Sequence, residues 1–390
     1  MEKKINLIPD RINNIKNLTK GNTIDSIIDF RNATETSFEY PTNTDDIREL
    51  LPKKYIDIKK VMAQLGGKLL YIKSGSTGHT FKGVHPPPND EKKEPYAVKV
   101  VAYPKKENYG DMYNIKRPEN TELLMIRLLS YFVINKQTPH IILPITTFNT
   151  SIKPFLNLAK ENIVKGKKFE QFVERYNKGD FYQNVSILIS EWANGGDLLE
   201  YIKKNYKSMD LKEWRVIIFQ ILSVLAVIHN KYPSFRHNDM KANNILIHKN
   251  GTDSVIKNYL YKINGQEYIV PNIGLQIKLW DFDFASIDNL IYNAKVEAKW
   301  TTEINITPKQ NRYYDIHYFF STLSRKGFFP ELLTAPEVPN KVRDFISRVI
   351  PEHVRSGKNV SERGRVLIND EIFTPDILLK TDDFFKSLRK

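Results

Sequence analysis

The sequence predicts a mixed α+β fold of two lobes, with a strand-rich first half followed by a helix-rich second half. Two sequence patterns predict this order of strands and helices, and the hydrophobic content is sufficient for a fold of this size. Short runs of the kind that form strands occur at 68–73, 80–84 and 96–102. After Gly196 the apolar residues recur with the period of a helix. The 390 residues are 41% hydrophobic, which is enough to fill a sizeable core.

The composition narrows the classes of function. The chain contains no cysteine, which excludes disulfides, thiolate metal sites and a cysteine nucleophile. The N-terminus lacks the apolar core of a signal peptide, and no run of about 18 apolar residues occurs, so we expect no transmembrane segment. A net charge of +14 favours acidic partners. Because the basic residues are scattered in pairs, we expect a solvated surface and no requirement for nucleic acid, with dedicated nucleic-acid binding as the alternative.

The first half divides into an extension and a lobe. Residues 1–60 are polar with short apolar patches, and we expect a partly helical N-terminal extension. The first lobe is expected over 61–190, with a basic insertion carrying a helix at about 150–183. Proline suits the first position of a helix, so Arg117-Pro118 predicts a helix that runs to about Tyr131. Two further strands are expected, at 141–148 and 185–189.

The second lobe is expected over 191–390. Asp210 and Glu213 form a plausible capping pair for a helix that ends near His229. A β-hairpin is expected at 259–270, because Asn264-Gly265 favours the tight turn that joins two antiparallel strands. This hairpin would lie in an insertion at about 250–275.

One stretch of the second lobe combines three groups that phosphoryl transfer requires. Residues 237–246 read H-N-D-M-K-A-N-N-I-L. A carboxylate such as Asp239 can orient a hydroxyl and accept its proton, and a cation such as Lys241 can stabilise the moving phosphoryl group. An amide oxygen such as that of Asn244 can hold a metal ion. This pattern resembles the catalytic loop of protein kinases.

The first lobe contains matching phosphate-binding signals. Residues 72–83 read I-K-S-G-S-T-G-H-T-F-K-G, and glycines let backbone N–H groups approach phosphates. The stretch resembles the kinase glycine-rich loop, although Lys73 replaces its first glycine. Lys99 follows in Tyr-Ala-Val-Lys, which resembles the strand lysine that contacts the α- and β-phosphates of ATP. Glu122 is the expected partner of Lys99, with Glu119 as its rival. Taken alone, these signals would indicate a plain turn and an exposed lysine.

Three further segments resemble kinase motifs. Residues 187–197 are similar to the hinge, in which backbone groups of Glu191 and Ala193 face adenine and Asp197 lies near the ribose. Asp281 begins Asp-Phe-Asp, which resembles Asp-Phe-Gly and implies a metal-chelating carboxylate. Asp283 replaces the glycine, and we expect it to tolerate a left-handed backbone there. Asp315 resembles the aspartate that anchors the catalytic loop.

These motifs together imply a bilobal protein-kinase-like fold, with a β-rich N-lobe and an α-helical C-lobe. The implied catalytic residues are Asp239 and Lys241, and the implied metal ligands are Asn244 and Asp281. The implied cofactors are ATP and Mg²⁺, with Mn²⁺ as an alternative, and the implied partners are protein substrates. The residues implied to bind ATP are Lys73, Ser74, Gly75, Ser76, Thr77, Gly78, Thr80, Ala97, Lys99, Glu122, Glu191, Ala193 and Asp197.

Two departures from the family concern regulation and origin. Asn238 stands where kinases usually have an arginine that pairs with a phosphorylated activation segment, so we expect less dependence on such phosphorylation. The activation segment, which lies between Asp281 and Asp315, is also short and lacks an Ala-Pro-Glu motif. The Asp-Phe-Asp-Phe motif and the later Tyr-Tyr-Asp-Ile-His are similar to the serine/threonine kinases of poxviruses, iridoviruses and giant viruses. That resemblance implies an intracellular protein of the host cytoplasm, with packaging in the virion as a further expectation.

The leading hypothesis is an active serine/threonine protein kinase, because Lys241 is typical of kinases that modify serine or threonine. Two alternatives stay open from the sequence. A small-molecule phosphotransferase would share the aspartate and asparagine but commonly lacks the lysine. A pseudokinase acting as a scaffold is favoured by Lys73 and Asp283. Against it, the polar residues that an active kinase needs are all present, namely Lys99, Asp239, Asn244 and Asp281.

Overall fold

The computed structural model describes residues 2–4, 8–21, 24–28, 44–75, 78–84, 94–160, 164, 166–250 and 256–390. The chain forms two compact units. We call Pro9–Leu128 with Leu143–Trp192 the strand-rich unit, and Met1–Ile8 with Leu129–Ile142 and Ala193–Lys390 the helical unit. The mixed α+β fold predicted from the sequence is confirmed.

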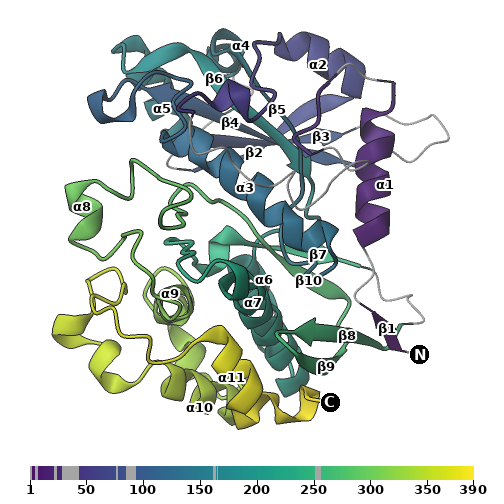
Figure 1. Cartoon of the computed structure of the whole chain (residues 1–390), viewed down its shortest axis with the longest axis vertical. Coiled ribbons are helices and arrows are strands. Elements are labelled where there is room, and N and C mark those ends of the chain that lie inside the picture. Colours follow the sequence, from purple (N-terminus) through teal and green to yellow (C-terminus); the bar gives the residue numbers. More distant parts are fainter. Residues whose placement is uncertain are drawn as a thin grey trace. The chain divides into compact units, whose positions relative to one another are not determined.

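The strand-rich unit is built on an antiparallel sheet of described strands in the order β2-β3-β4-β6-β5 (Figure 1). These strands are β2 (Lys68–Ser74), β3 (Gly78–Val84), β4 (Tyr96–Pro104), β5 (Pro144–Ser151) and β6 (Phe181–Glu191). The central strand β4 is buried along almost its whole length, and it is paired on both edges, with β3 and with β6. Helix α3 (Pro118–Ile134) begins at the expected proline.

Extra helices surround this sheet. They are α1 (Ile8–Thr19), α2 (Ile58–Leu65), α4 (Lys153–Lys160) and α5 (Lys167–Asn177). The described residues of the insertion expected to carry a helix contain α4 and α5, each with apolar residues spaced for one buried face, such as Phe169 and Phe172 on α5. The extension also pairs with strand β5. The Ile56 N–H donates to the Asn149 carbonyl, and the Asn149 N–H donates to a carbonyl of the extension. It thereby covers an edge that would otherwise expose unpaired backbone groups.

One predicted strand begins later than expected. The sequence predicted a strand at 141–148, but β5 starts at Pro144. Ile141 and Ile142 belong to the helical unit, where they pair with the backbone of Leu279. The apolar run is continuous in sequence because both parts are buried, although they join different sheets.

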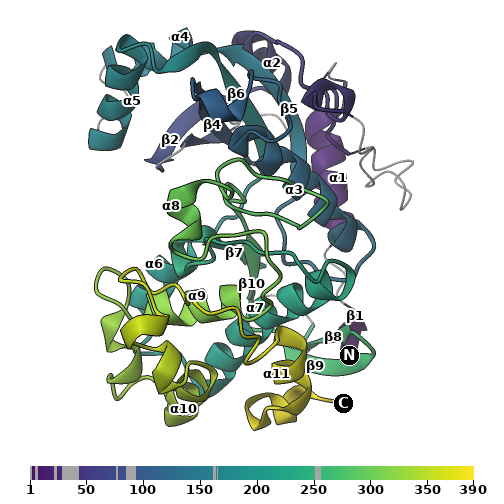
Figure 2. The ribbon, with the colours of Figure 1, turned by 60° about the vertical axis from the view of Figure 1, so that its left-hand side comes forward.

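The helical unit is organised around α7 (Leu211–Lys231), which is buried along most of its length (Figure 2). Asp210 caps this helix, and its carboxylate accepts the N–H of Glu213, as expected for the capping pair. The other described helices are α6 (Leu198–Asn205), α8 (Lys299–Thr302), α9 (Tyr314–Leu323), α10 (Asn340–Val349) and α11 (Pro375–Thr381). None of the described helices is both long and apolar enough to cross a membrane.

Two small sheets complete the helical unit. Strands β7 (Ile245–Lys249) and β10 (Leu275–Leu279) pair antiparallel. The predicted hairpin is confirmed as β8 (Asn258–Ile263) and β9 (Gln266–Pro271), with Asn264 and Gly265 both at positive φ in the turn. Strand β1 (Glu2–Lys4) adds parallel to β8, which the sequence did not predict.

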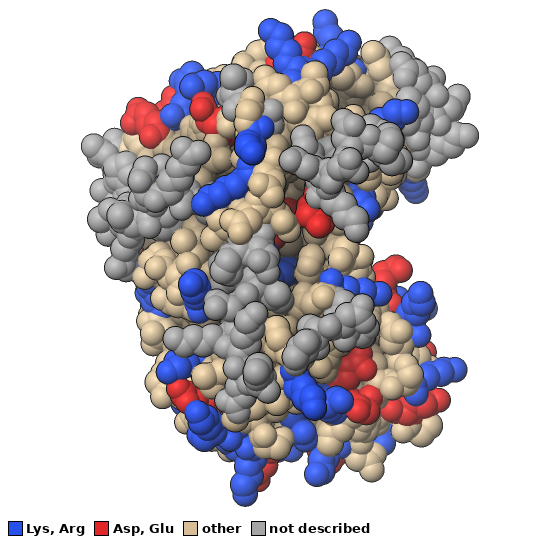
Figure 3. Space-filling model, turned by 90° about the vertical axis from the view of Figure 1, so that its right-hand side faces the viewer, with Lys and Arg blue, Asp and Glu red and all other residues tan. Residues whose placement is uncertain are grey.

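Charged side chains are mixed on the face shown in Figure 3. Lysines and arginines on that face are separated by uncharged surface and by acidic residues. The net charge of +14 therefore does not gather into one stripe among the coloured residues of that face.

Candidate functional site

The catalytic-loop segment 237–246 is fixed by a buried carboxylate. Asp315, on α9, accepts the backbone N–H of His237 at 2.7 Å and that of Asn238 at 2.9 Å. This confirms the predicted anchoring contact. Burial raises the pKa of Asp315, and the two backbone donors oppose that rise. Asn238 adopts φ 62°, a left-handed conformation that asparagine tolerates better than most residues.

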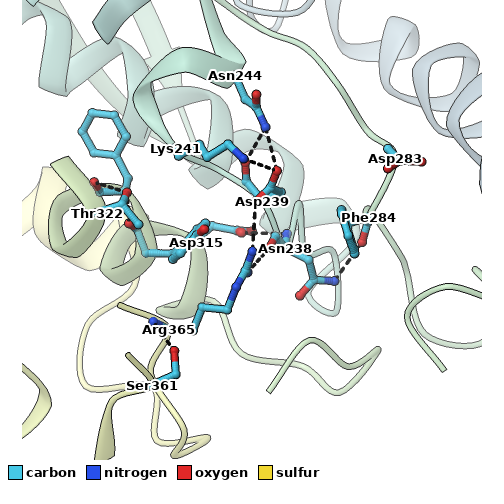
Figure 4. Close-up of polar contacts among 12 residues, drawn as sticks. Asn238, Asp239, Lys241, Asn244, Asp283, Phe284, Asp315, Thr322, Ser361 and Arg365 are labelled. Atoms are coloured by element: carbon cyan, nitrogen blue, oxygen red, sulfur yellow. Dashed lines mark hydrogen bonds and ion pairs between the residues drawn. The ribbon is translucent and has the colours of Figure 1, made fainter. Parts of the chain in front are cut away.

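Asp239 lies at the centre of a cluster of donors (Figure 4). Its Oδ2 accepts Lys241 Nζ and Asn244 Nδ2, each at 2.9 Å. Its Oδ1 accepts Arg365 Nη2, also at 2.9 Å. The structure thus brings together the three catalytic-loop residues predicted from the sequence and adds Arg365, which was not predicted.

The oxygen chemistry of this unit fits a hard divalent cation. Asn244 Nδ2 donates to both the carbonyl and the carboxylate of Asp239, and its amide oxygen points away from Asp239 (Figure 4). Asn244 precedes β7 and Asp281 follows β10. Because Ile245 pairs with Leu279, both residues lie at the same end of this two-stranded sheet. An amide oxygen and a carboxylate are ligands that Mg²⁺ accepts.

The Asp-Phe-Asp turn differs from the expectation. Asp283 was expected to take the left-handed backbone, but the residue with positive φ is Asp281, at 67°. Asp283 instead forms an ion pair with Lys295, whose ammonium also lies 3.8 Å from the ring centre of Phe284. Glycine is therefore not required at this position, because the backbone turns two residues earlier, at Asp281, and the extra carboxylate of Asp283 has a cation.

Both ends of the activation segment are held by residues next to His237. Asn238 Nδ2 donates to the carbonyl of Phe284 at 3.0 Å, near the start of the segment. Arg236 is fully buried and donates to Thr307 Oγ1 at 3.0 Å and to the carbonyl of Asn305. The segment thus has fixed contacts that involve no phosphate group.

In the strand-rich unit, Lys99 and Glu122 form the predicted ion pair. Lys99 Nζ lies 2.6 Å from Glu122 Oε1, and both side chains are almost completely buried. Glu119, the rival, instead pairs with Arg117 at 3.1 Å. A buried pair of this kind fixes the direction of the lysine. The sequence signal was the spacing of Glu122 on the first turns of α3.

The glycine-rich segment forms the end of the β2–β3 hairpin. Gly75 N–H donates to the carbonyl of Gly78 at 2.8 Å. Ser76 and Thr77, two predicted ATP contacts, lie outside the described residues. A Cβ at Gly78 would lie 2.9 Å from both the Val100 carbonyl and Val101 Cγ2, so this position requires glycine.

The other predicted residues of this region lie on paired strands. Lys73 pairs across the sheet with Thr80, and Thr80 pairs with Lys99 on its other side. Ala97 lies on β4 opposite Ser190 of β6. Their contacts with a nucleotide stay predictions.

Aromatic residues of the insertion support this hairpin. His79 packs against both Phe169 and Phe172, with ring centres 4.7 and 4.6 Å away, and the two phenylalanine rings are 5.5 Å from each other. Burial lowers the pKa of His79 to about 4, so the ring is neutral near neutral pH. Its Nδ1 lies 2.7 Å from Ser74 Oγ, which in turn contacts the hydroxyl of Tyr71 at 2.7 Å.

The predicted hinge residues have structural partners of their own. The Glu191 carboxylate binds the guanidinium of Arg11 on α1 through two contacts and accepts the N–H of Leu143 at 2.7 Å. Ala193 and Asp197 belong to the helical unit, where the Asp197 carboxylate caps α6 by accepting the Glu200 N–H at 3.0 Å. Contacts of these residues with adenine or ribose stay predictions.

His317 is buried on α9. Its Nε2 lies 2.6 Å from the Val354 carbonyl, and burial lowers its pKa to about 4. The functional candidates that sequence reasoning missed are Arg11, Arg236 and Arg365. Their partners lie far away in sequence, so no local signal marks them.

Comparisons with known proteins agree with this geometry. The protein kinase domain family matches residues 71–303. R400 of Acanthamoeba polyphaga mimivirus, named as a serine/threonine-protein kinase, is 46% identical over 388 residues, covering 97% of this chain and 80% of R400. Serine/threonine-protein kinase 2 of fowlpox virus is 26% identical over 249 residues, covering 62% of this chain and 50% of the relative. Serine/threonine-protein kinase 2 of swinepox virus is 30% identical over 148 residues, covering 37% of this chain and 30% of the relative. The chain therefore belongs to the protein kinase family and to its serine/threonine type, among relatives from large DNA viruses.

Proposed function

We propose that this chain is a catalytically active kinase that transfers the γ-phosphoryl group of Mg-ATP to serine or threonine hydroxyls of proteins. The observation on which this proposal rests is the Asp239 cluster. The Asp239 carboxylate accepts Lys241 and Asn244 at 2.9 Å, so the three groups required at the reacting centre already have fixed relative positions.

Each group of the cluster has a distinct task. Asp239 orients the acceptor hydroxyl and accepts its proton, which is the task of a carboxylate base in phosphoryl transfer. Lys241 places positive charge where the transferred phosphoryl group carries negative charge. A divalent metal ion held by Asn244 and Asp281 would neutralise charge on the phosphates. In the strand-rich unit, Lys99 is directed by Glu122 toward its task as the phosphate-binding cation.

The activity test compares Asp239→Asn with the wild type. The substitution keeps the shape of the side chain but removes the carboxylate, so labelled-phosphate transfer to protein acceptors should fall by a factor of roughly 10² to 10⁴. Asp344→Asn, an exposed position of α10, is the matched control and should leave transfer unchanged. Equal transfer by Asp239→Asn and wild type would refute the proposed function.

Two further arms separate the alternatives. A small-molecule phosphotransferase would label small hydroxyl acceptors in preference to proteins, and a pseudokinase would show no turnover with either. Assays with Mg²⁺, with Mn²⁺ and with a chelator identify the metal that supports turnover. Activity that survives complete chelation would refute the metal part of the proposal.

We also propose that the protein acts inside the infected host cell and is packaged in the virion. The relatives from mimivirus and poxviruses support this proposal. The test is quantitative mass spectrometry of purified particles and of fractionated infected cells. Absence from both the cytoplasmic fraction and the particles would contradict it.

A further inference from the structure

Arg365 is a buried cation in direct contact with the carboxylate of Asp239 (Figure 4). Its side chain is 6% exposed, against 25% for Lys241, the other cation on Asp239. Arg365 Nη2 donates to Asp239 Oδ1 at 2.9 Å, and Nη1 donates to the carbonyl of Asn238. One guanidinium thus binds both the backbone before Asp239 and the Asp239 side chain.

The surroundings of Arg365 hold it in one position. Nη1 also donates to the Tyr314 hydroxyl at 2.9 Å, and the guanidinium lies 3.9 Å from the ring centre of Tyr318. Both tyrosines are on the buried helix α9, which also carries Asp315, the anchor of the catalytic loop. The same helix therefore carries both the carboxylate that fixes the catalytic loop and the tyrosines that hold Arg365.

The backbone around Arg365 is equally constrained. Ser361 and Arg365 close a tight turn, because the Arg365 N–H donates to Ser361 Oγ at 3.0 Å and the Ser361 N–H donates to the Arg365 carbonyl at 2.8 Å. Gly364 adopts φ 83°, and a Cβ there would lie 2.5 Å from Arg325 Nε. The turn is thus packed closely enough to require glycine next to Arg365.

We propose that Arg365 is a positioning residue for Asp239. It holds the carboxylate in one orientation, with Oδ2 directed toward Lys241 and Asn244, so that Asp239 is in place to orient an incoming hydroxyl. The planar fork of a guanidinium suits this task because its donors have fixed relative directions. The inference rests on the proposed function, since it concerns the residue that would orient the acceptor.

The contacts favour positioning over inhibition. Arg365 also binds the Asn238 carbonyl and the Tyr314 hydroxyl, so its contacts fix the backbone before Asp239 as well as the carboxylate itself. Oδ2 carries the two contacts with the residues that phosphoryl transfer needs. If Arg365 were inhibitory, its removal would raise turnover, which is the opposite of the expected result.

The test uses Arg365→Ala in the full-length protein with added guanidinium ion. We expect kcat to fall by a factor of about 10², the loss expected when a catalytic group is slightly misplaced. The KM for ATP should stay within twofold, because Arg365 contacts none of the residues predicted to bind the nucleotide. Guanidinium, at concentrations far below those that unfold the protein, should restore part of kcat by occupying the vacated space.

Three controls exclude a structural effect. Urea has a similar shape but no charge and should not restore kcat, and sodium chloride at the same ionic strength should not either. Arg355→Ala removes another arginine of the helical unit, one that contacts backbone carbonyls and Glu352, and it should respond to none of the additives. Arg365→Lys, which keeps the charge and the stem, should also lose kcat because one ammonium cannot replace the forked contacts.

The outcomes distinguish this inference from the proposed function. Adding Arg365→Ala to Asp239→Asn should cause no further loss, because the group that Arg365 positions is already absent. An inactive Asp239→Asn with an Arg365→Ala kcat within twofold of wild type, or above it, would overturn the inference alone. Equal rescue by urea and guanidinium would also overturn it. If Arg365→Ala does not fold, the kcat of Arg365→Lys decides, and a value within twofold of wild type overturns the inference.

Discussion

The catalytic loop of the helical unit and the glycine-rich hairpin of the strand-rich unit are held in place by different forces. The catalytic loop is fixed by directional hydrogen bonds from buried polar groups: Asp315 binds the backbone before Asp239, and Arg365 binds the Asp239 carboxylate. The hairpin is paired with β4 through the backbone of β3, and its side chains are supported by aromatic packing of His79 against Phe169 and Phe172. Hydrogen bonds fix individual atoms, whereas packing fixes the position of a backbone.

This difference matches the chemistry expected of each region. Orienting a hydroxyl requires one carboxylate to point in one direction, so its support must specify atoms. Binding phosphates through backbone N–H groups requires that the hairpin backbone as a whole be correctly placed, and packing can fix that position. We therefore expect substitutions of single polar atoms to affect kcat in the catalytic loop, and losses of apolar volume to affect ATP binding in the hairpin.

Among the substitutions that test this comparison of the loop and the hairpin, Asp315→Asn is expected to have the largest effect on catalysis. The amide can accept only one of the two backbone N–H groups and presents its own N–H to the other, so one buried donor loses its partner. We expect a loss of about 2–3 kcal/mol in the free energy of unfolding. We also expect a fall in kcat of more than about tenfold, because the loop that carries Asp239 is released. Urea denaturation and steady-state kinetics measure these two effects.

Asp344→Asn is the control for the change from aspartate to asparagine, since Asp344 is exposed. An Asp315→Asn protein with unchanged kcat would show that hydrogen bonds to the loop backbone are dispensable. That result would contradict the claim that directional hydrogen bonds to the catalytic loop determine kcat.

An intermediate effect is expected for Phe172→Ala. Phe172 is 6% exposed, and its loss would leave a cavity beside His79 and Phe169 at a cost of about 3–5 kcal/mol. Because the hairpin loses its packing partner, we expect the KM for ATP to rise several-fold with little change in kcat. Phe172→Leu keeps most of the apolar volume and should have a smaller effect on both quantities. A fall in kcat without a change in KM would contradict this assignment.

The residues predicted correctly from the sequence share one property: their signals lie in local spacing. Asn264-Gly265 indicates its turn within two residues, and Glu122 follows from the periodicity of one helix. Arg365 and Arg11 could not be found this way, because their partners Asp239 and Glu191 are 126 and 180 residues away. An arginine in an isolated sequence resembles any surface cation, and only the tertiary fold buries it beside a carboxylate.

Lys53 shows a further contrast between the units, and it yields the smallest predicted effect on catalysis. In the helical unit, the buried Arg365 pairs with a carboxylate. In the strand-rich unit, Lys53 is 1% exposed and donates instead to the hydroxyls of Thr147 at 3.2 Å and Ser186 at 2.5 Å. Burial lowers the pKa of Lys53 to about 7, with Glu119 and Glu122 opposing the shift.

The sign of the resulting pH dependence follows from proton binding. In the unfolded chain Lys53 has a pKa near 10.4, so between about pH 7 and pH 10.4 the unfolded state binds one proton more than the folded state. The free energy of unfolding should therefore rise with pH in this window, by at most about 1.4 kcal/mol per pH unit from this group. Protonation of the buried amine destabilises the fold fully below pH 7 and ceases to do so as the pH approaches 10.4.

Lys53→Met removes this contribution while keeping a similar side-chain length. Relative to wild type, the variant should be most stable at pH 6.5, and its advantage should shrink steadily up to about pH 9.5. Turnover should be unaffected, because Lys53 contacts none of the predicted catalytic residues. Urea denaturation across this pH range measures the difference, and Lys54→Met, at an exposed neighbouring position, should run parallel to wild type. If the free energy of unfolding of Lys53→Met also ran parallel to that of wild type across this pH range, the buried amine would stay charged. The hydroxyls of Thr147 and Ser186 would then stabilise a buried cation as well as a carboxylate does.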